Sequence, residues 1–408
     1  MPSISLRPSC IASVAALTFL AMQTSHAQQE PVKIGLVLAK QGAFAIYGST
    51  AAQGAQFAAD EKGMKVLGRK LELIWLDEAN PNDAQQNMTK LAQQDKVSAI
   101  IGGSNSATAL ALTATAKREK VPVVLTAGSA KEITGAQCNR YTYRISYSLP
   151  VANKAIGTYF LSQGKKWYFL VANYSFGQDT YALLNPFLAQ NGGTTVGKDD
   201  IPMGTTDYSS FILKVRQANP DVVVAGLGGA DHTNFLKQFA EYGLAAKIPV
   251  ANPFASDDYI WGLSPEAATG MYTKVWHYDN PANLPRENEF AAAWQKKYNK
   301  PASTEAWQGW MTMNFVLAAM ENAGKTDPKS VAQALETTRL DMGAGQSYDF
   351  RGWDHQMLKP VPIAKAHPAP ASDKWKMMDI VANIPPQSKD LDAFYGSKQE
   401  VGCNMDDF

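Results

Sequence analysis

The chain has 408 residues, of which 45% are hydrophobic, and a formal net charge of +1 at pH 7. This length exceeds what one hydrophobic core usually serves, so we expect two domains. The near-neutral charge, with no basic run or face, argues against a nucleic-acid partner.

Residues 1–27 have the three parts of a secretory signal peptide. Arg7 comes first, an apolar stretch follows at 11–22, and Ala27 is a small residue suited to a signal-peptidase site. The apolar stretch is shorter than the ~20 residues that span a bilayer. We therefore predict cleavage near Ala27 and no stable insertion into a membrane. Cys10 precedes the apolar stretch, where a lipid-modified cysteine does not lie, so a free periplasmic protein is expected.

Strand-like and helix-like segments alternate through the first part of the mature chain. The alternation follows from apolar runs bounded by turn residues, and from helices that end on glycine or begin after a capping signal. It predicts a parallel, doubly wound α/β sheet. The expected strands are 32–39, 71–77, 98–103 and 121–127, and the expected helices are 47–63, 83–95 and 107–120.

The same pattern then repeats, which predicts a second, similar lobe. Helices that follow it lack a strand series of their own, so they must pack on an existing lobe, and the chain must cross between lobes more than once. From about Met357 the chain is rich in Pro and Lys and is predicted to be irregular. The second lobe has expected helices at 150–163, 177–190, 207–218 and 231–242 and strands at 166–172, 221–227 and 247–252; after an extended segment at 270–278, the later helices are 285–298, 303–324 and 328–338.

Small, hydroxyl-rich loops follow the third and fourth predicted strands, at 102–108 and 126–130. Ligands of parallel α/β sheets bind at the carboxyl ends of the strands. Backbone N–H groups, hydroxyls and a helix N-terminus together suit a carboxylate. Ordinary N-capping is the alternative for either loop alone, but two such loops at neighbouring strand ends favour a binding site.

The sequence contains no enzyme motif that we can identify. It lacks H-E-x-x-H, G-x-S-x-G and phosphate-loop patterns, and the acidic pair Asp257-Asp258 is interpreted as solvated. We therefore expect no catalysis, metal or cofactor. Aromatic residues at predicted strand ends and between the lobes indicate instead an aromatic-walled cleft for a small molecule; they are Tyr47, Tyr147, Tyr174, Phe176, Phe254 and Trp276.

Several segments together resemble the periplasmic leucine/isoleucine/valine-binding proteins, the solute receptors of branched-chain amino-acid-type ABC transporters. The resemblance covers about residues 32–365 and rests on the order and spacing of VKIGLVLAKQGAFAIYG, LELIWLDEANPNDAQQN, IIGGSNSATALALTATAKREKVPVVLTAGSAKEIT, YTYRISYS, VANYSFGQDT, DVVVAGLGGADHTNFLKQFAEYGL and GMYTKVWHY. It implies a type I periplasmic-binding fold, in which two doubly wound α/β lobes, joined by three hinge crossovers, close on a ligand.

The resemblance also implies where the lobes divide. We place the crossovers near 147–148, 274–275 and 355–359. Lobe 1 is then 28–147 plus 275–357, and lobe 2 with a C-terminal segment is 148–274 plus 358–408.

Matching positions in this family imply the ligand-binding residues. The loop after the third strand, with Asn105 and Ser106, is expected to hold the ligand carboxylate. The next loop contributes Gly128 and Ser129. The aromatic walls and the second-lobe loop complete the predicted site with Tyr47, Tyr147, Phe176, Leu227, Gly228 and Phe254.

One departure from the family pattern concerns the ligand. Amino-acid-binding members carry an acidic residue where this chain has Asn252-Pro253-Phe254. An ammonium closed into a cleft needs a charge partner, and Asp231 and Asp257 could substitute only from unmatched positions. The predicted ligand is therefore a small carboxylate, either an aromatic or aliphatic acid without an amine or an amino-acid-like molecule.

Two cysteines, Cys138 and Cys403, remain once the signal peptide is removed. An even pair in an exported protein predicts one disulfide, with two buried free thiols as the alternative. The expected protein is a monomer that delivers its ligand to an ABC permease. A ligand-sensing subunit of a membrane receptor and an exported enzyme are the alternatives.

Overall fold

The computed structural model describes residues 1–4, 30–386, 388–405 and 408. Most of the predicted signal peptide at 1–27, including Cys10 and the cleavage site near Ala27, lies outside these residues. Residues 31–408 form one compact unit, which is described below. No helix of the described part of the chain is long and apolar enough to cross a membrane.

The first sheet contains six strands in the order β2-β3-β1-β4-β5-β6. All neighbouring strands pair in parallel except β2 and β3, which are antiparallel. β4 is buried along its whole length, as expected for a strand with helices on both faces of the sheet. The elements of this region are β1 (Val32–Val37), α1 (Ala45–Glu61), β2 (Lys65–Val66), β3 (Arg69–Leu76), α2 (Pro81–Lys90), β4 (Ala99–Gly102), α3 (Ser106–Glu119), β5 (Val123–Leu125) and β6 (Thr142–Arg144), with short helical turns at Gly42–Phe44 and Leu91–Asp95.

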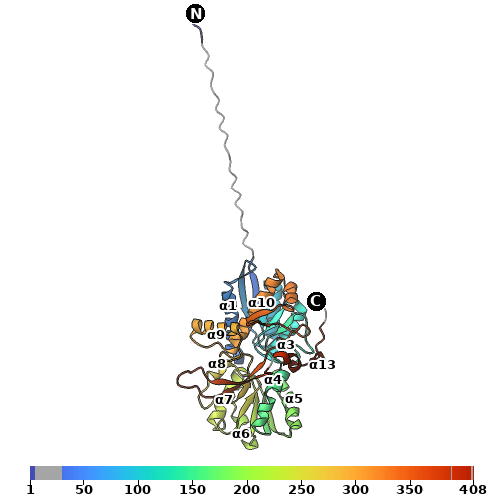
Figure 1. Ribbon diagram of the computed structural model, residues 1–408, viewed down its shortest axis with the longest axis vertical. Helices are drawn as coiled ribbons and strands as arrows, with labels where there is room; N and C mark the ends of the chain where they lie inside the picture. The colour runs from blue at the N-terminus through green and yellow to red at the C-terminus, as the bar shows by residue number, and fades with distance from the viewer. Residues whose placement is uncertain (5–29, 387, 406–407) are drawn as a thin grey trace. The chain divides into compact units, whose positions relative to one another are not determined.

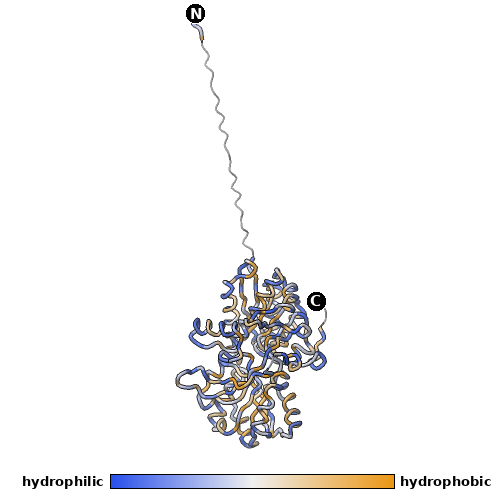
Figure 2. Tube along the Cα trace, viewed as in Figure 1, coloured by the Kyte–Doolittle hydropathy of each residue, from blue (hydrophilic) through white to orange (hydrophobic). Residues whose placement is uncertain are grey.

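The second sheet contains seven strands in the order β15-β14-β11-β10-β9-β7-β8. The five strands from β11 to β8 are parallel, and β14 and β15 add an antiparallel edge. Figure 2 shows hydrophobic and hydrophilic stretches interspersed along the chain; in this sheet β9 is buried throughout, whereas the edge strand β8 is mostly half-buried. Its elements are α4 (Leu149–Ser162), β7 (Lys166–Ala172), α5 (Ser175–Gln190), β8 (Thr194–Ile201), α6 (Ser209–Ala218), β9 (Val222–Gly226), α7 (Gly229–Glu241), β10 (Val250–Asn252), α8 (Asp257–Ile260), β11 (Met271–Thr273), β14 (Val361–Ala366) and β15 (Met378–Ile384).

The helices between β11 and β14 pack on the first sheet, not the second. α10 (Thr304–Ala323) lies along α1 (Figure 1). Gly54 and Gly309 allow this close approach, because a Cβ at either position would overlap a backbone carbonyl oxygen of the other helix. The neighbouring elements are α9 (Pro285–Tyr298), α11 (Pro328–Leu335) and the hairpin of β12 (Leu340–Gly343) and β13 (Gln346–Tyr348).

The chain thus passes between the two sheets three times, after β6, after β11 and before β14. We call the first sheet with its helices lobe 1 and the second sheet with its helices lobe 2. The predicted two-lobe α/β fold is confirmed. Two crossovers touch, because Arg144 at the end of β6 forms an isolated parallel bridge with Gln356.

The prediction of an irregular chain after Met357 is wrong. This stretch contains β14 and β15, which pair antiparallel from Val361 opposite Ile384 to Ala366 opposite Met378. Pro362 lies within β14, and a proline interrupts a ladder only where its missing N–H is needed. Its carbonyl still accepts a hydrogen bond from the Lys274 N–H at 2.8 Å.

The segment after β15 returns to lobe 1. A disulfide joins Cys403 to Cys138, with the two Cα atoms 5.7 Å apart, so the predicted pairing is confirmed. The Phe408 ring meets the Tyr141 ring edge-on at 5.6 Å. Between β15 and Cys403, the segment also contacts lobe 2, because Lys154 of α4 donates to the Phe394 carbonyl at 3.2 Å. The segment, which includes α12 (Leu391–Tyr395) and α13 (Lys398–Val401), therefore contacts both lobes.

Candidate ligand-binding site

A pocket lies between the lobes, at the carboxyl ends of strands from both sheets. The pocket is narrow, with a cavity volume of about 40 Å³. Both lobes and two of the crossovers contribute to its wall, so relative movement of the lobes would open or close it. The lining residues are Phe44, Tyr47, Ser104, Asn105, Ser106, Ala127, Gly128, Ser129, Ser146, Tyr174, Phe176, Gly228, Phe254, Val275 and Gln308.

The loop between β4 and α3 presents hydroxyls and a helix N-terminus to this pocket. Asn105 caps α3, since its side-chain oxygen accepts from the N–H groups of Ala107 and Thr108 at 2.9 and 3.1 Å. The Ser106 Oγ accepts from the Ser129 N–H at 3.1 Å. That bond leaves the hydroxyl hydrogen of Ser106 for another acceptor, so this end of the pocket suits an anion.

The loop after β5 approaches α3 closely enough to require glycine at one position. Gly128 has φ +83°, in the left-handed region, and a Cβ there would overlap the Cβ of Ala109. A side chain at this position would therefore push the loop away from α3 and separate Ser129 from Ser106.

A buried carboxyl group supports the same wall from behind. The Glu78 side chain accepts from the Gly103 and Ser104 N–H groups at 3.1 and 2.5 Å. Burial raises the pKa of Glu78 to about 7 despite these hydrogen bonds, which lower it. At neutral pH the group is thus divided between its neutral and ionised forms, and its neutral form places less negative charge beside the pocket.

Aromatic rings form the other walls. Tyr174 and Phe176, at the start of α5, lie nearly parallel with ring centroids 6.4 Å apart. Gly228 leaves room for this wall, because a Cβ there would lie 3.1 Å from the Tyr174 hydroxyl and 3.0 Å from the Phe44 ring. Tyr47 donates to the side-chain oxygen of Gln308, which fixes its ring against α10. These rings can pack against the faces of a flat ligand.

The lining contains no charged side chain. Asp257 is fully buried and accepts from Lys274, at 2.9 Å, and from Thr304. Asp231 accepts from the Gly204 N–H through both carboxylate oxygens at 3.0 Å. Neither aspartate lines the pocket, so neither is placed to hold a ligand ammonium.

The two lobes are in contact around the pocket. The Tyr259 hydroxyl of lobe 2 donates to the Ala43 carbonyl of lobe 1 at 2.7 Å. Lys131 of lobe 1 lies 3.4 Å from Asp179 of lobe 2. These contacts join the two lobes directly, so the lobes are in a closed arrangement.

The structure brings most of the sequence-predicted site together. Nine of the predicted residues line the pocket: the aromatic candidate Tyr174 and, of the family-matched positions, Tyr47, Asn105, Ser106, Gly128, Ser129, Phe176, Gly228 and Phe254.

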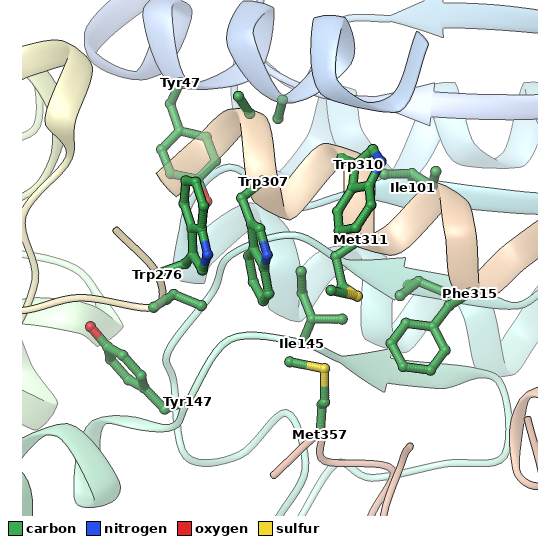
Figure 3. Close-up of a cluster of buried hydrophobic side chains, with 14 of the residues drawn as sticks. Tyr47, Ile101, Ile145, Tyr147, Trp276, Trp307, Trp310, Met311, Phe315 and Met357 are labelled. Carbon is green, nitrogen blue, oxygen red and sulfur yellow. The ribbon is translucent and has the colours of Figure 1, made fainter. Parts of the chain in front are cut away.

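Two predicted residues lie elsewhere. The Tyr147 hydroxyl pairs with the Thr273 hydroxyl at 2.6 Å, between two crossovers, and Leu227 belongs to the core of lobe 2. Trp276, an aromatic candidate, lies in the core of lobe 1 beside Trp307 (Figure 3), with rings 6.1 Å apart and 7° from parallel.

Sequence reasoning missed six lining residues. Ser104 and Ala127 lie within the two hydroxyl-rich loops and Phe44 precedes α1, so loop position alone could have suggested them. Ser146, Val275 and Gln308 gave no such signal, because their place depends on how the crossovers and α10 pack on lobe 1.

A family model described as periplasmic binding protein matches residues 31–371. This chain belongs to the periplasmic binding protein family. It is 26% identical over 359 residues to Leu/Ile/Val-binding protein homolog 7 of Brucella abortus (strain 2308), covering 82% of this chain and 89% of the relative.

Solved structures of periplasmic binding proteins share the fold. One from Burkholderia mallei has a TM-score of 0.81 at 24% identity and covers 91% of this chain and 98% of its own. A solute-binding protein of an ABC transporter from Rhodopseudomonas palustris BisB5, in complex with 3,4-dihydroxybenzoic acid, has a TM-score of 0.78 at 24% identity, covering 87% of this chain and 97% of its own. Membership of this family places the chain among binding proteins, not enzymes.

Proposed function

We propose that this periplasmic binding protein captures a small aromatic acid between its lobes and delivers it to an ABC permease. The observation that carries the proposal is the composition of the pocket. Hydroxyls and the N-terminus of α3 gather at one end, aromatic rings form the walls, and no carboxylate side chain lines the cavity. A ligand with a carboxylate and no ammonium satisfies all three features.

The Rhodopseudomonas palustris relative, solved with 3,4-dihydroxybenzoic acid, supports the same ligand class. The cavity of about 40 Å³ is far smaller than an ordinary ligand pocket, so the lobes must move apart before a substituted ring can enter. For a ligand to enter, the contacts between the lobes, Tyr259 with Ala43 and Lys131 with Asp179, must break. We propose that residues 31–147 with 275–357, and 148–274 with 358–384, are the two bodies that move.

Calorimetric titration of the purified mature protein tests this function. Benzoate, 4-hydroxybenzoate and 3,4-dihydroxybenzoate should bind and raise the melting temperature, whereas leucine should do neither at the same concentration. Binding of leucine with no response to any aromatic acid would contradict the proposal.

We also propose that the exported protein is cleaved near Ala27 and is a monomer. N-terminal sequencing of the exported protein should show the cleavage site, and light scattering should report a monomer.

A further inference from the structure

Arg144, at the end of β6, is a fully buried cation that has no ion-pair partner among the described residues. Its side chain is 0% exposed. It donates to the Gln356 side-chain oxygen at 2.8 Å, to the Ala130 carbonyl at 2.8 Å and to the Thr134 hydroxyl. All these acceptors are neutral, although a buried charge is usually paired with an opposite one.

The acid that acts most strongly on Arg144, Asp354, is already paired with another cation. Asp354 binds Arg351 through both oxygens, at 3.0 and 2.7 Å. The Asp354–Arg351 pair therefore does not neutralise Arg144, and Glu132, whose charge also acts on Arg144, forms no ion pair with it. Desolvation lowers the pKa of Arg144 to about 10, which leaves it charged at neutral pH.

The Arg144 guanidinium lies behind the end of the pocket that we propose for the carboxylate. Arg144 also approaches the Gly128 carbonyl at 3.4 Å. The peptide group of that carbonyl carries the Ser129 N–H, which donates to the Ser106 Oγ at 3.1 Å. The chain of polar groups therefore runs from the guanidinium through one peptide to the hydroxyl that faces the cavity, and each group polarises the next.

We infer that Arg144 is a positioning residue that supplies the counter-charge for a ligand carboxylate without touching it. It holds the loop of Gly128 and Ser129 through carbonyl groups and orients the Ser106 hydroxyl as a donor. The inference rests on the proposed function and adds to it: a pocket with an uncharged lining selects an anion because a cation lies one layer behind. A neutral ligand of the same shape gains nothing from that charge.

Paired titrations of benzoate and benzamide, its neutral isostere, test this role. Arg144→Met should lower benzoate affinity on the order of tenfold or more and change benzamide affinity by less than about threefold. Arg144→Lys should recover part of the benzoate affinity, because it restores the charge. Arg118→Met, which removes an exposed cation on α3, controls for net charge and should leave the benzoate-to-benzamide ratio unchanged.

The outcomes separate the inference from the function on which it rests. Equal losses for both probes in Arg144→Met would make the residue purely structural and overturn the inference. If benzamide fails to bind any of the proteins, the comparison of Arg144→Lys with Arg144→Gln decides: a charge effect ranks Lys above Gln for benzoate, and equal affinities overturn it. Failure of the wild-type protein to bind any carboxylate would overturn the proposed function itself.

Discussion

The carboxylate of Asp257, in lobe 2, accepts hydrogen bonds from both the N–H and the hydroxyl of Thr304, in lobe 1, at 2.7 and 2.9 Å. Thr304 begins α10, so an acid from one lobe caps a helix of the other. The same carboxylate contacts Lys274 and His277 of the second crossover at 2.9 and 3.0 Å. Asp257 therefore links both lobes to a crossover within one buried group.

Replacement of this acid should cost stability and ligand affinity together. Asp257→Asn leaves the buried Lys274 without its partner, which typically costs about 3–5 kcal/mol. Urea unfolding should show the loss, and calorimetry should show weaker benzoate binding. The neighbouring Asp258→Asn is the control, since it removes an ion pair with the partly exposed Lys300 and leaves no fully buried cation unpaired. Equal effects of the two substitutions would contradict the role given to Asp257.

The hydroxyl-rich loops should contribute to affinity more than to folding. Ser106→Ala and Ser129→Ala should each weaken binding of an aromatic carboxylate by roughly 1–3 kcal/mol, because each removes a group able to bond a charged ligand. Isothermal titration measures the loss. Ser162→Ala, which removes an exposed hydroxyl at the end of α4, should leave affinity unchanged. Wild-type affinity in both loop variants would mean that other residues hold the carboxylate.

Stability should fall as the pH rises across neutrality because of Glu78. Its folded pKa of about 7 lies above its ordinary value of 4.5, so the folded state holds the proton more tightly than the unfolded chain. This stabilising contribution is fully present below pH 4.5 and is lost as the pH rises through about 7. Buried Glu305, whose pKa is also raised by burial, acts in the same direction.

Glu78→Gln should flatten the decline in unfolding free energy between about pH 5 and 8, because glutamine has no proton to lose. Chemical denaturation at several pH values measures the slope. Glu72→Gln, at an exposed position of β3, serves as the matched control. An unchanged slope in Glu78→Gln would assign the pH dependence to other groups.

Any side chain at Gly309 should destabilise the packing of α1 against α10. A methyl group there overlaps the Ala51 carbonyl oxygen, and the backbones must separate to admit it. Overpacking of this kind costs about 1–3 kcal/mol, which thermal unfolding would detect. Gly262→Ala, where the new Cβ lies 3.5 Å from the nearest atom, should be close to neutral.

The alternation of apolar runs and helix signals was sufficient to predict most parallel strands of both lobes, because buried strands such as β9 are apolar throughout. The polar strand β8 escaped prediction. β8 lies at the edge of the second sheet and most of its residues are half-buried. Edge strands often carry charged residues, so its TTVGKDDI sequence lacks the apolar run that marks a buried strand.

Parts of the site that lie in loops could be predicted, since strand order places loop residues at one edge of each sheet. Gln308 could not, because it faces the pocket from a helix that joins lobe 1 only through tertiary packing. The interpretation of Asp257 as solvated is wrong for the same reason: its partners, Lys274 and Thr304, are distant in sequence and meet it only after the lobes assemble.

The position of the Cys138–Cys403 disulfide also restricts when this bond can form. It spans 265 residues, so it cannot form until synthesis has passed Cys403 and both thiols have reached an oxidising compartment. Cys138 therefore stays unpaired until then. Covalent closure is then a late step of maturation, and a protein retained in the reducing cytoplasm would lack it.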